Sequence, residues 1–232
     1  MKNHIQFFSV LIIVILLTAC APKPVAPVVT PTSSVSSTGP IPNSLVTIEA
    51  AAEDIIDFAP SGDWGKINKD VTDIESAWKS YLPKADEAGA SKEIQDAMNS
   101  ALAKLEAASA SKDASATMQG SNDVSAAVVE LFALYGPKVP ADIGRLDVLE
   151  RQVILDVEAK DYSAATKSLS KTMSVWREVK PSVLEHNGKD VAAQFEASLE
   201  IQAVAVDSKN DTQLTNEARN GLEIVDALEG LY

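Results

Sequence analysis

One histidine and two pairs of closely spaced carboxylates are the candidates beyond residue 19 for binding a metal ion or transferring protons. The histidine, His186, stands in the stretch Leu-Glu-His-Asn-Gly, where Asn187 and Gly188 predict the end of a helix. Neither a Glu-x-x-His nor a His-x-x-Glu spacing, which bundle metal sites use, includes it. Nothing in the sequence places a serine and an acid beside it, as a hydrolytic triad requires. We therefore expect His186 to lie on the surface and the protein not to be an enzyme.

The carboxylate pairs are Asp54 with Asp57 and Asp70 with Asp73, each three residues apart. On a helix this spacing puts both carboxylates on one face, and oxygen ligands of this kind suit calcium. No loop with further oxygen ligands at a fixed spacing accompanies either pair, and acidic helix faces are usually only hydrated. We expect no metal ion and no other cofactor.

The only cysteine, Cys20, follows an apolar run from Ile5 to Leu17 that one positive side chain, Lys2, precedes. The run is short for a membrane-spanning helix, which needs about 20 apolar residues. It ends in small residues, as a signal-peptide cleavage site requires. An ordinary secretory peptide or a single membrane anchor would leave Cys20 as an exposed reactive thiol. That interpretation explains less than covalent modification of Cys20.

The stretch Leu17-Thr18-Ala19-Cys20 resembles a bacterial lipobox, the signal that lipoprotein-processing enzymes recognise. The resemblance implies attachment of a diacylglycerol to Cys20, cleavage before it and acylation of the new amino terminus. Several acyl chains anchor a protein stably, whereas a single chain binds a membrane only marginally. We therefore expect residues 1–19 to be a signal peptide. The mature protein would be held by lipid on the extracytoplasmic side of the cell membrane or outer membrane.

Charge and composition narrow the range of partners. Removal of residues 1–19 takes away one of the 20 basic residues and none of the 33 acidic ones, so 19 minus 33 leaves a net charge of −14. That charge argues against nucleic acid as a partner and against electrostatic adhesion to anionic lipid. Residues 20–43 contain Pro22, Pro24, Pro27, Pro31, Pro40 and Pro42 among Ser, Thr and Val. They predict an extended tether that reaches roughly 70 Å at about 3.1 Å per residue.

The remaining residues, 44–232, contain an internal repeat. An offset of 98 pairs Asp63 with Asp161, Trp78 with Trp176 and Pro83 with Pro181; an offset of 97 pairs Met98 with Phe195, Ser111-Lys112 with Ser208-Lys209 and Tyr135 with Tyr232. Shared helical composition inflates such an alignment, but chance does not readily hold the register this far. The period is much longer than the 20 to 50 residues of solenoid repeats. The sequence therefore predicts two copies, residues 44–136 and 137–232, each a small bundle.

Apolar residues recur at helical spacing in eight segments, and no segment alternates as a strand does. The apolar stripes are Leu45, Ile48, Ala52 and Ile55; Ile67, Val71, Ile74, Trp78, Tyr81 and Leu82; Ile94, Met98, Leu102 and Leu105; Val124, Val128, Leu131 and Leu134; Ile143, Leu146, Leu149 and Val153; Leu169, Met173, Trp176 and Val179; Val191, Phe195 and Leu199; and Leu222, Val225, Leu228 and Leu231. The predicted fold is all-α, with two tandem, internally duplicated bundles of about four helices each.

Helix boundaries agree with these stripes. Ser91 and Asp211 are predicted N-caps, and Pro140 precedes a predicted helix start. Gly136-Pro137 should stop the last helix of the first copy, and the stretch from Gly136 to Asp142 joins the two copies.

The repeated aromatic residues and prolines are the remaining candidates for special roles. Trp78 and Trp176 each stand five residues before a proline, Pro83 or Pro181. Exposed tryptophans at these positions could form two ligand platforms. Both lie on apolar stripes, however, so we expect core tryptophans beside prolines that bend or end their helices. We assign the same structural role to Tyr135 and Tyr232.

A duplicated extracytoplasmic bundle is similar in plan to imelysin-like iron-uptake proteins. Their His-x-x-Glu motif is absent from this sequence, so the resemblance concerns architecture alone. Two classes of function stay open. The one we favour is a non-catalytic binding or scaffolding bundle whose partner is an envelope protein or small ligand. The alternative is a bundle that binds a metal ion, haem or a small molecule in envelope uptake or sensing. A groove between the copies is the expected site, because domain interfaces commonly host ligands.

Overall fold

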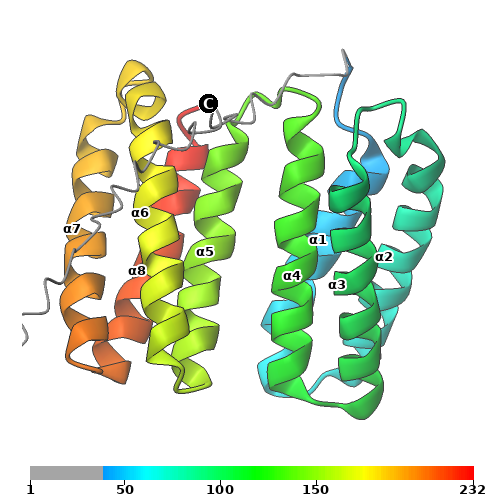
Figure 1. Ribbon diagram of the computed structural model, residues 1–232, viewed down its shortest axis with the longest axis horizontal. Coiled ribbons are helices and arrows are strands. Elements are labelled where there is room, and N and C mark those ends of the chain that lie inside the picture. Colours follow the sequence, from blue (N-terminus) through cyan, green and yellow to red (C-terminus); the bar gives the residue numbers. More distant parts are fainter. Residues whose placement is uncertain (1–38) are drawn as a thin grey trace, which may run out of the picture. The chain divides into compact units, whose positions relative to one another are not determined.

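The computed structural model describes residues 39–232, and in this range it contains helices and no β-strand, which confirms the predicted all-α fold (Figure 1). The elements are α1 (Asn43–Phe58), η1 (Ala59–Ser61), α2 (Trp64–Ala85), α3 (Lys92–Ser111), α4 (Ala114–Ala133), α5 (Ala141–Glu158), α6 (Tyr162–Glu185), α7 (Lys189–Asp207) and α8 (Asp211–Glu229). Cys20, the predicted signal peptide and most of the predicted tether lie outside the described residues. The last residue assigned to the tether, Asn43, is the first residue of α1.

The eight α-helices form two groups of four (Figure 1). In the first group α1 packs against α2 and α4, and α3 closes the ring by packing against the same two helices. In the second group α5 packs against α6 and α8, and α7 closes the ring. Each group surrounds a hydrophobic core of its own. The two four-helix bundles meet where α4 packs against α5.

The cores are built from the predicted apolar stripes, with a few exceptions. Most stripe residues are buried in one of the two cores. The prediction that Leu82 belongs to the apolar stripe is wrong, because its side chain is exposed, whereas the neighbouring Tyr81 is buried. Leu149 was also placed on its stripe, but it is only half-buried, and the neighbouring Glu150 is the fully buried residue. A carboxyl group therefore occupies a core position of α5.

The turns of the two bundles share an uncommon backbone feature. Residues with positive φ occur at Gly62 and Lys160, at Gly89 and Asn187, and at Lys112 and Lys209. The members of these pairs are 98, 98 and 97 residues apart, the offsets at which the sequence repeats. A left-handed residue commonly ends a helix, and outside glycine it is uncommon enough to be informative. The matching offsets agree with the predicted duplication. The duplication itself stays a prediction.

The N-caps correct one boundary. Ser91 caps α3 as predicted, since its side chain accepts a hydrogen bond from the Ile94 amide. The cap of α8 is Asn210, whose side chain accepts a hydrogen bond from the Gln213 amide, and Asp211 is the first helical residue instead. Asp211 was the wrong choice because its carboxylate accepts hydrogen bonds from Lys160 and Tyr162, which stand at the connection between α5 and α6.

Neither repeated proline ends its helix. Pro83 lies inside α2, which continues to Ala85, and Pro181 lies inside α6, which continues to Glu185. Both stand in the last turns of long helices, where the loss of one backbone hydrogen bond is more easily tolerated than at the centre. Pro140 precedes α5 as its N-cap, as expected. The chain leaves α4 at Leu134, two residues before the predicted stop at Gly136.

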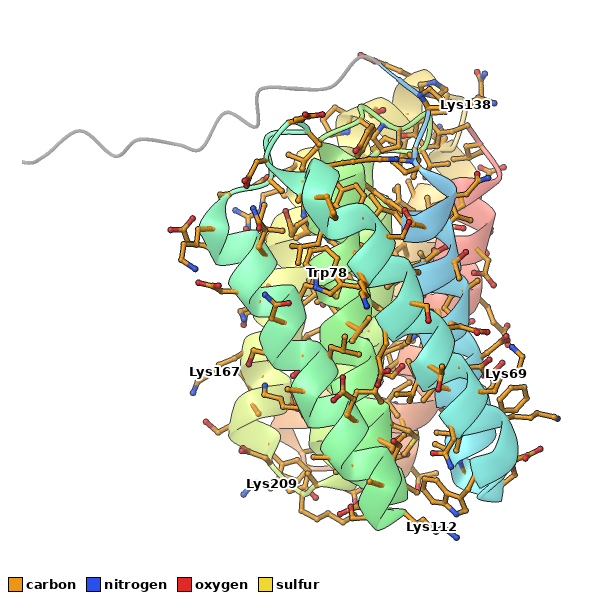
Figure 2. The ribbon with its side chains drawn as sticks, turned by 90° about the vertical axis from the view of Figure 1, so that its right-hand side faces the viewer. Lys69, Trp78, Lys112, Lys138, Lys167 and Lys209 are labelled. Atoms are coloured by element: carbon orange, nitrogen blue, oxygen red, sulfur yellow. The ribbon has the colours of Figure 1, made fainter. Side chains whose placement is uncertain are left out.

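The two repeated tryptophans lie in matching surroundings within the two bundles. Trp78 and Trp176 are each 4% exposed, so neither ring offers a platform to a ligand. The indole N–H of Trp78 donates to Asn99 at 2.7 Å, and that of Trp176 donates to Glu196 at 3.4 Å. Figure 2 shows Trp78 between the helices of the first bundle, while the labelled lysines of both bundles lie at the outline of the view.

Tyr135 and Tyr232 each form a hydrogen bond within their own bundle. The Tyr135 hydroxyl donates to the hydroxyl of Tyr81, and the Tyr232 hydroxyl donates to Ser182 Oγ at 2.9 Å. Each bond joins the end of its bundle's last helix to the proline-containing helix of the same bundle. Both tyrosines are half-buried.

We expect Trp176→Ala to lower the free energy of unfolding by about 3 to 5 kcal/mol, because it removes a large buried ring and leaves a cavity beside Phe195. Chemical denaturation followed by circular dichroism measures this change. Lys167→Ala, an exposed substitution on the same helix, is the matched control and should change stability by less than about 0.5 kcal/mol. Equal effects of the two substitutions would contradict the core assignment.

Candidate functional site

The contact between the bundles contains a pocket of about 510 Å³. Four helices and η1 contribute its lining, which comprises Ile56, Asp57, Pro60, Met118, Arg151, Ile154, Leu155, Glu158, Arg219 and Leu222. We call this the interbundle pocket. Its walls come from α1, η1 and α4 of the first bundle and from α5 and α8 of the second. The sequence predicted a groove between the two copies as the binding site, and this pocket lies there.

A second pocket of about 340 Å³ opens at the other end of the same helices. It is lined by the start of α1, the end of α4, the connection to α5 and the end of α8, including Ile41, Phe132, Val139 and Glu229. Because α1 and α8 contribute opposite ends to the two pockets, the pockets are separated along the length of the bundles.

An arginine that lines the interbundle pocket links α5 to α1. Arg151 on α5 donates to Glu53 on α1 at 2.8 Å and forms an ion pair with Asp147, one turn back on α5, at 2.6 Å. The side chain of Arg151 is only 15% exposed. Asp147 is also 15% exposed, whereas Glu53 is 47% exposed. Arg151 therefore holds α1 of one bundle to α5 of the other.

Several carboxylates lie near the single guanidinium group of Arg151. Glu49 on α1 and Glu229 on α8 lie close enough to add to the negative potential around Glu53 and Asp147. Burial, with repulsion from these neighbours, raises the pKa of Glu49 to about 7. Burial likewise raises the pKa of Asp147 to about 7, although Arg151 lowers it. The charge between the bundles therefore changes near neutral pH.

One N–H end of Arg151 is not satisfied. Its Nη2 atom makes the two contacts to Glu53 and Asp147, but Nη1 is buried and has no hydrogen-bond partner among the described residues. A buried donor without an acceptor is costly and rare in folded proteins. Arg219, the other arginine of the interbundle pocket, is exposed and forms no ion pair within residues 39–232. Both arginines line the interbundle pocket, and the Nη1 atom of Arg151 is enclosed by protein.

A buried polar cluster lies in the core of the second bundle. Glu150 on α5 is 0% exposed and accepts a hydrogen bond from the Gln202 amide at 2.9 Å. Gly221 on α8 makes room for the carboxyl group, since a Cβ there would lie 2.8 Å from the Glu150 carboxyl carbon. Burial raises the pKa of Glu150 to about 8, so the group is mainly neutral at pH 7. Glu150 Oε1 and Gln202 Oε1 have no other partner, and a protonated carboxyl could donate where a carboxylate cannot.

The first bundle has no such cluster. At an offset of 98 Glu150 corresponds to Ala52, and at an offset of 97 Gln202 corresponds to Leu105; both partners are buried apolar residues. Sequence analysis missed Glu150 although a signal was present. The spacing of Ile143, Leu146, Glu150 and Val153 is three, four and three residues, which places the glutamate on the apolar stripe.

The other predicted polar candidates do not come together. His186 is exposed at the end of α6, where its Nδ1 contacts the Ser182 carbonyl and its ring packs against Tyr232. Asp70 and Asp73 both form ion pairs with Lys69. Within residues 39–232 no group of three or more His, Cys, Asp or Glu side chains is arranged to hold a metal ion. None of the helices in this range is both long and apolar enough to cross a bilayer.

Comparison with known proteins identifies no family or relative for this chain. No family model matches the chain, no curated protein matches it, and no solved structure matches it.

We expect Glu150→Gln to flatten the pH dependence of stability. A carboxyl whose pKa is raised from 4.5 to about 8 by folding keeps its proton in the folded state and loses it in the unfolded state between these values. The free energy of unfolding therefore falls by up to about 1.4 kcal/mol per pH unit over this window as the pH rises. The amide cannot titrate and still pairs with Gln202, so the variant should lose the part of the slope that Glu150 contributes. Glu49 and Asp147, whose pKa values are also raised, keep their part.

The measurement is urea denaturation at a series of pH values from 5 to 8. Glu223→Gln, which removes a carboxylate from an exposed position of α8, is the control and should keep the slope. If the wild-type and Glu150→Gln proteins show the same slope, the buried carboxyl is not protonated as described.

Proposed function

We propose that the protein is a lipoprotein, anchored through acylated Cys20 on the extracytoplasmic side of a membrane, whose helical body binds a partner without catalysis. The interbundle pocket is the binding site. The observation that carries the proposal is the pocket's position and lining: it lies where two separately packed bundles meet, and apolar side chains of both bundles line it together with Arg151 and Arg219. Pockets at such junctions commonly host ligands.

The surroundings of the titratable groups support a role without catalysis. Nucleophiles and general bases must reach a substrate, and a base must be within hydrogen-bond distance of the proton it takes. Burial raises the pKa of Glu150 to about 8, but its carboxyl group is enclosed by protein. Asp147 is engaged by Arg151. His186 lies at the far end of α6, away from the interbundle pocket.

A second candidate function is the binding of a small molecule for uptake or sensing. The pocket volume of about 510 Å³ falls within the range of roughly 300 to 1,000 Å³ that is common for small-molecule sites. The metal and haem forms of this alternative receive no comparable support from a specific feature of residues 39–232.

We expect Cys20→Ala to abolish lipid attachment and signal-peptide cleavage, because the thiol is the acceptor of the diacylglycerol in the lipobox scheme. Mass spectrometry of the amino terminus and detergent partitioning of the protein from cells measure both effects. Ser34→Ala, a substitution in the predicted tether, is the control and should leave processing unchanged. A mature amino terminus at any residue other than Cys20 would contradict the proposal.

We expect a photo-crosslinking amino acid at Leu222, in the interbundle pocket, to capture the partner in intact cells. The same amino acid at Val204, which is 66% exposed on α7 and outside the pocket, should not capture it. Gel electrophoresis and mass spectrometry of the adducts measure the difference. The same adducts at both positions, or none at Leu222, would count against the pocket as the binding site.

A further inference from the structure

The contact between the two bundles is close along one helix pair and looser along another. Within residues 39–232, α4 packs directly against α5, whereas α1 and α8 approach each other without comparable packing (Figure 1). Both α1 and α8 line the interbundle pocket, and both line the second pocket at the other end. The bundles are therefore joined at the contact of α4 with α5, which we call the seam, and are hollowed between α1 and α8.

Acidic side chains gather where α1, α5 and α8 approach one another. The five residues concerned, which we call the acid cluster, are Glu49 and Glu53 on α1, Asp147 on α5, and Asp226 and Glu229 on α8. Glu53, Asp147 and Glu229 repel the charge of Glu49. Glu53, Asp226 and Glu229 repel that of Asp147. Like charges from both bundles therefore face one another across this contact.

Two basic side chains lie beside the acid cluster. Arg151 on α5 pairs with Glu53 and Asp147. Lys138, in the connection from α4 to α5, lines the second pocket together with two members of the cluster, Glu49 and Glu229. When every carboxyl group is ionised, five negative charges stand against two positive ones, which leaves a charge of −3 between the bundles.

The other bases near these helices lie elsewhere. Arg219 is ten residues before Glu229 on α8, about 15 Å along the helix. α4 contains no lysine or arginine, and its Glu130 pairs with Arg145 of α5 within the seam. The basic residues of α2 and α6 are exposed, apart from Lys180, which pairs with a glutamate of α7. The excess of negative charge is therefore not cancelled by a neighbouring helix.

The closed contact holds protons that an open one would release. Burial and the repulsion from neighbouring acids raise the pKa of Glu49 from 4.5 to about 7 and that of Asp147 from 3.8 to about 7. If α1 and α8 separate, both groups gain water and lose acidic neighbours, so their pKa values fall toward the ordinary ones. Between those values and about 7 the closed state binds more protons, and its stability therefore decreases as the pH rises through this window.

We propose that α1 and α8 form a pH-sensitive gate, which stays closed while the acid cluster is partly protonated and opens about the seam when the cluster is ionised. Opening widens both pockets. The seam can act as the hinge because side-chain amides join it: Asn122 and Gln119 on α4 bond to Gln152 on α5, and amides do not titrate. This inference goes beyond the proposed binding function and does not depend on it.

The test measures distances between pairs of nitroxide spin labels by double electron–electron resonance. It uses the body, residues 39–232, which contains every residue of both cores and no cysteine. Ala50→Cys on α1 and Ala227→Cys on α8, both at exposed positions, report the gate. Ala50→Cys with Ala103→Cys on α3 reports a distance inside the first bundle and is the control.

We expect a second, longer distance for the gate pair between pH 5 and 8. Its population relative to the short distance should rise with pH, by up to about tenfold per pH unit for each proton released on opening. The control pair should show one unchanged distance. Circular dichroism at each pH verifies that the helices remain folded.

Substitutions assign the effect to the acid cluster. Glu49→Gln combined with Asp147→Asn removes the two protonated groups at nearly constant shape and should keep the labels at the short distance at every pH. Asp54→Asn combined with Glu223→Gln removes exposed acids of α1 and α8 outside the cluster and should preserve the response. Glu150→Gln should preserve it too, because Glu150 lies in the second bundle and not between the bundles.

The proposal is overturned if the gate pair shows the same distances from pH 5 to 8. It is also overturned if the change persists when Glu49 and Asp147 are both replaced. Should that double variant be unfolded, Glu49→Gln alone decides the question, because no hydrogen bond engages the Glu49 carboxyl group within residues 39–232. A response as steep as that of the wild-type body in this single variant would contradict the proposal.

Discussion

The packing of α4 against α5 is the contact on which the rest of the arrangement depends. Asn122 on α4 donates to the Val148 carbonyl and to the Gln152 side chain on α5, and Gln119 exchanges hydrogen bonds with Gln152 in both directions. Further along the same helices Arg145 binds Glu130 with two N–H groups. Amides have to meet at defined positions, whereas apolar side chains can slide, so this seam sets the register between the bundles. That register in turn places α1 opposite α8 and creates the interbundle pocket.

The two separate apolar cores explain why several acidic residues can lie between the bundles. Each bundle has an apolar core, so stability does not depend on the polar contacts between the bundles. Glu49, Glu53 and Asp147 can therefore surround Arg151 at a cost that the cores offset. The same separation allows Glu150 to be buried in the second core beside Gly221, a departure that the first core does not share.

Helix type and number were predictable from the sequence because apolar periodicity is strong in every segment. Errors arose where a boundary depends on a single hydrogen bond. Asn210 and Asp211 are both good N-caps, and the choice was made by the competing bonds of Asp211 to Lys160 and Tyr162, which join residues far apart in the sequence. Arg151, Arg219 and Glu150 could not be singled out as site residues, because their importance comes from partners on other helices. A groove between the copies could be predicted because two bundles must meet somewhere. The residues that line it could be identified only from the structure.

Each bundle closes on itself, with the first helix of each set packing against the fourth, α1 against α4 and α5 against α8. All contacts that complete the first core therefore lie before the connection at Gly136, and none waits for the second half of the chain. Such local connectivity favours rapid folding. During synthesis or export the leading half can reach its final packing while the trailing half is still unfolded, and domains generally fold in this order. The seam on α4, already rigid by then, would serve as the surface on which the second bundle assembles.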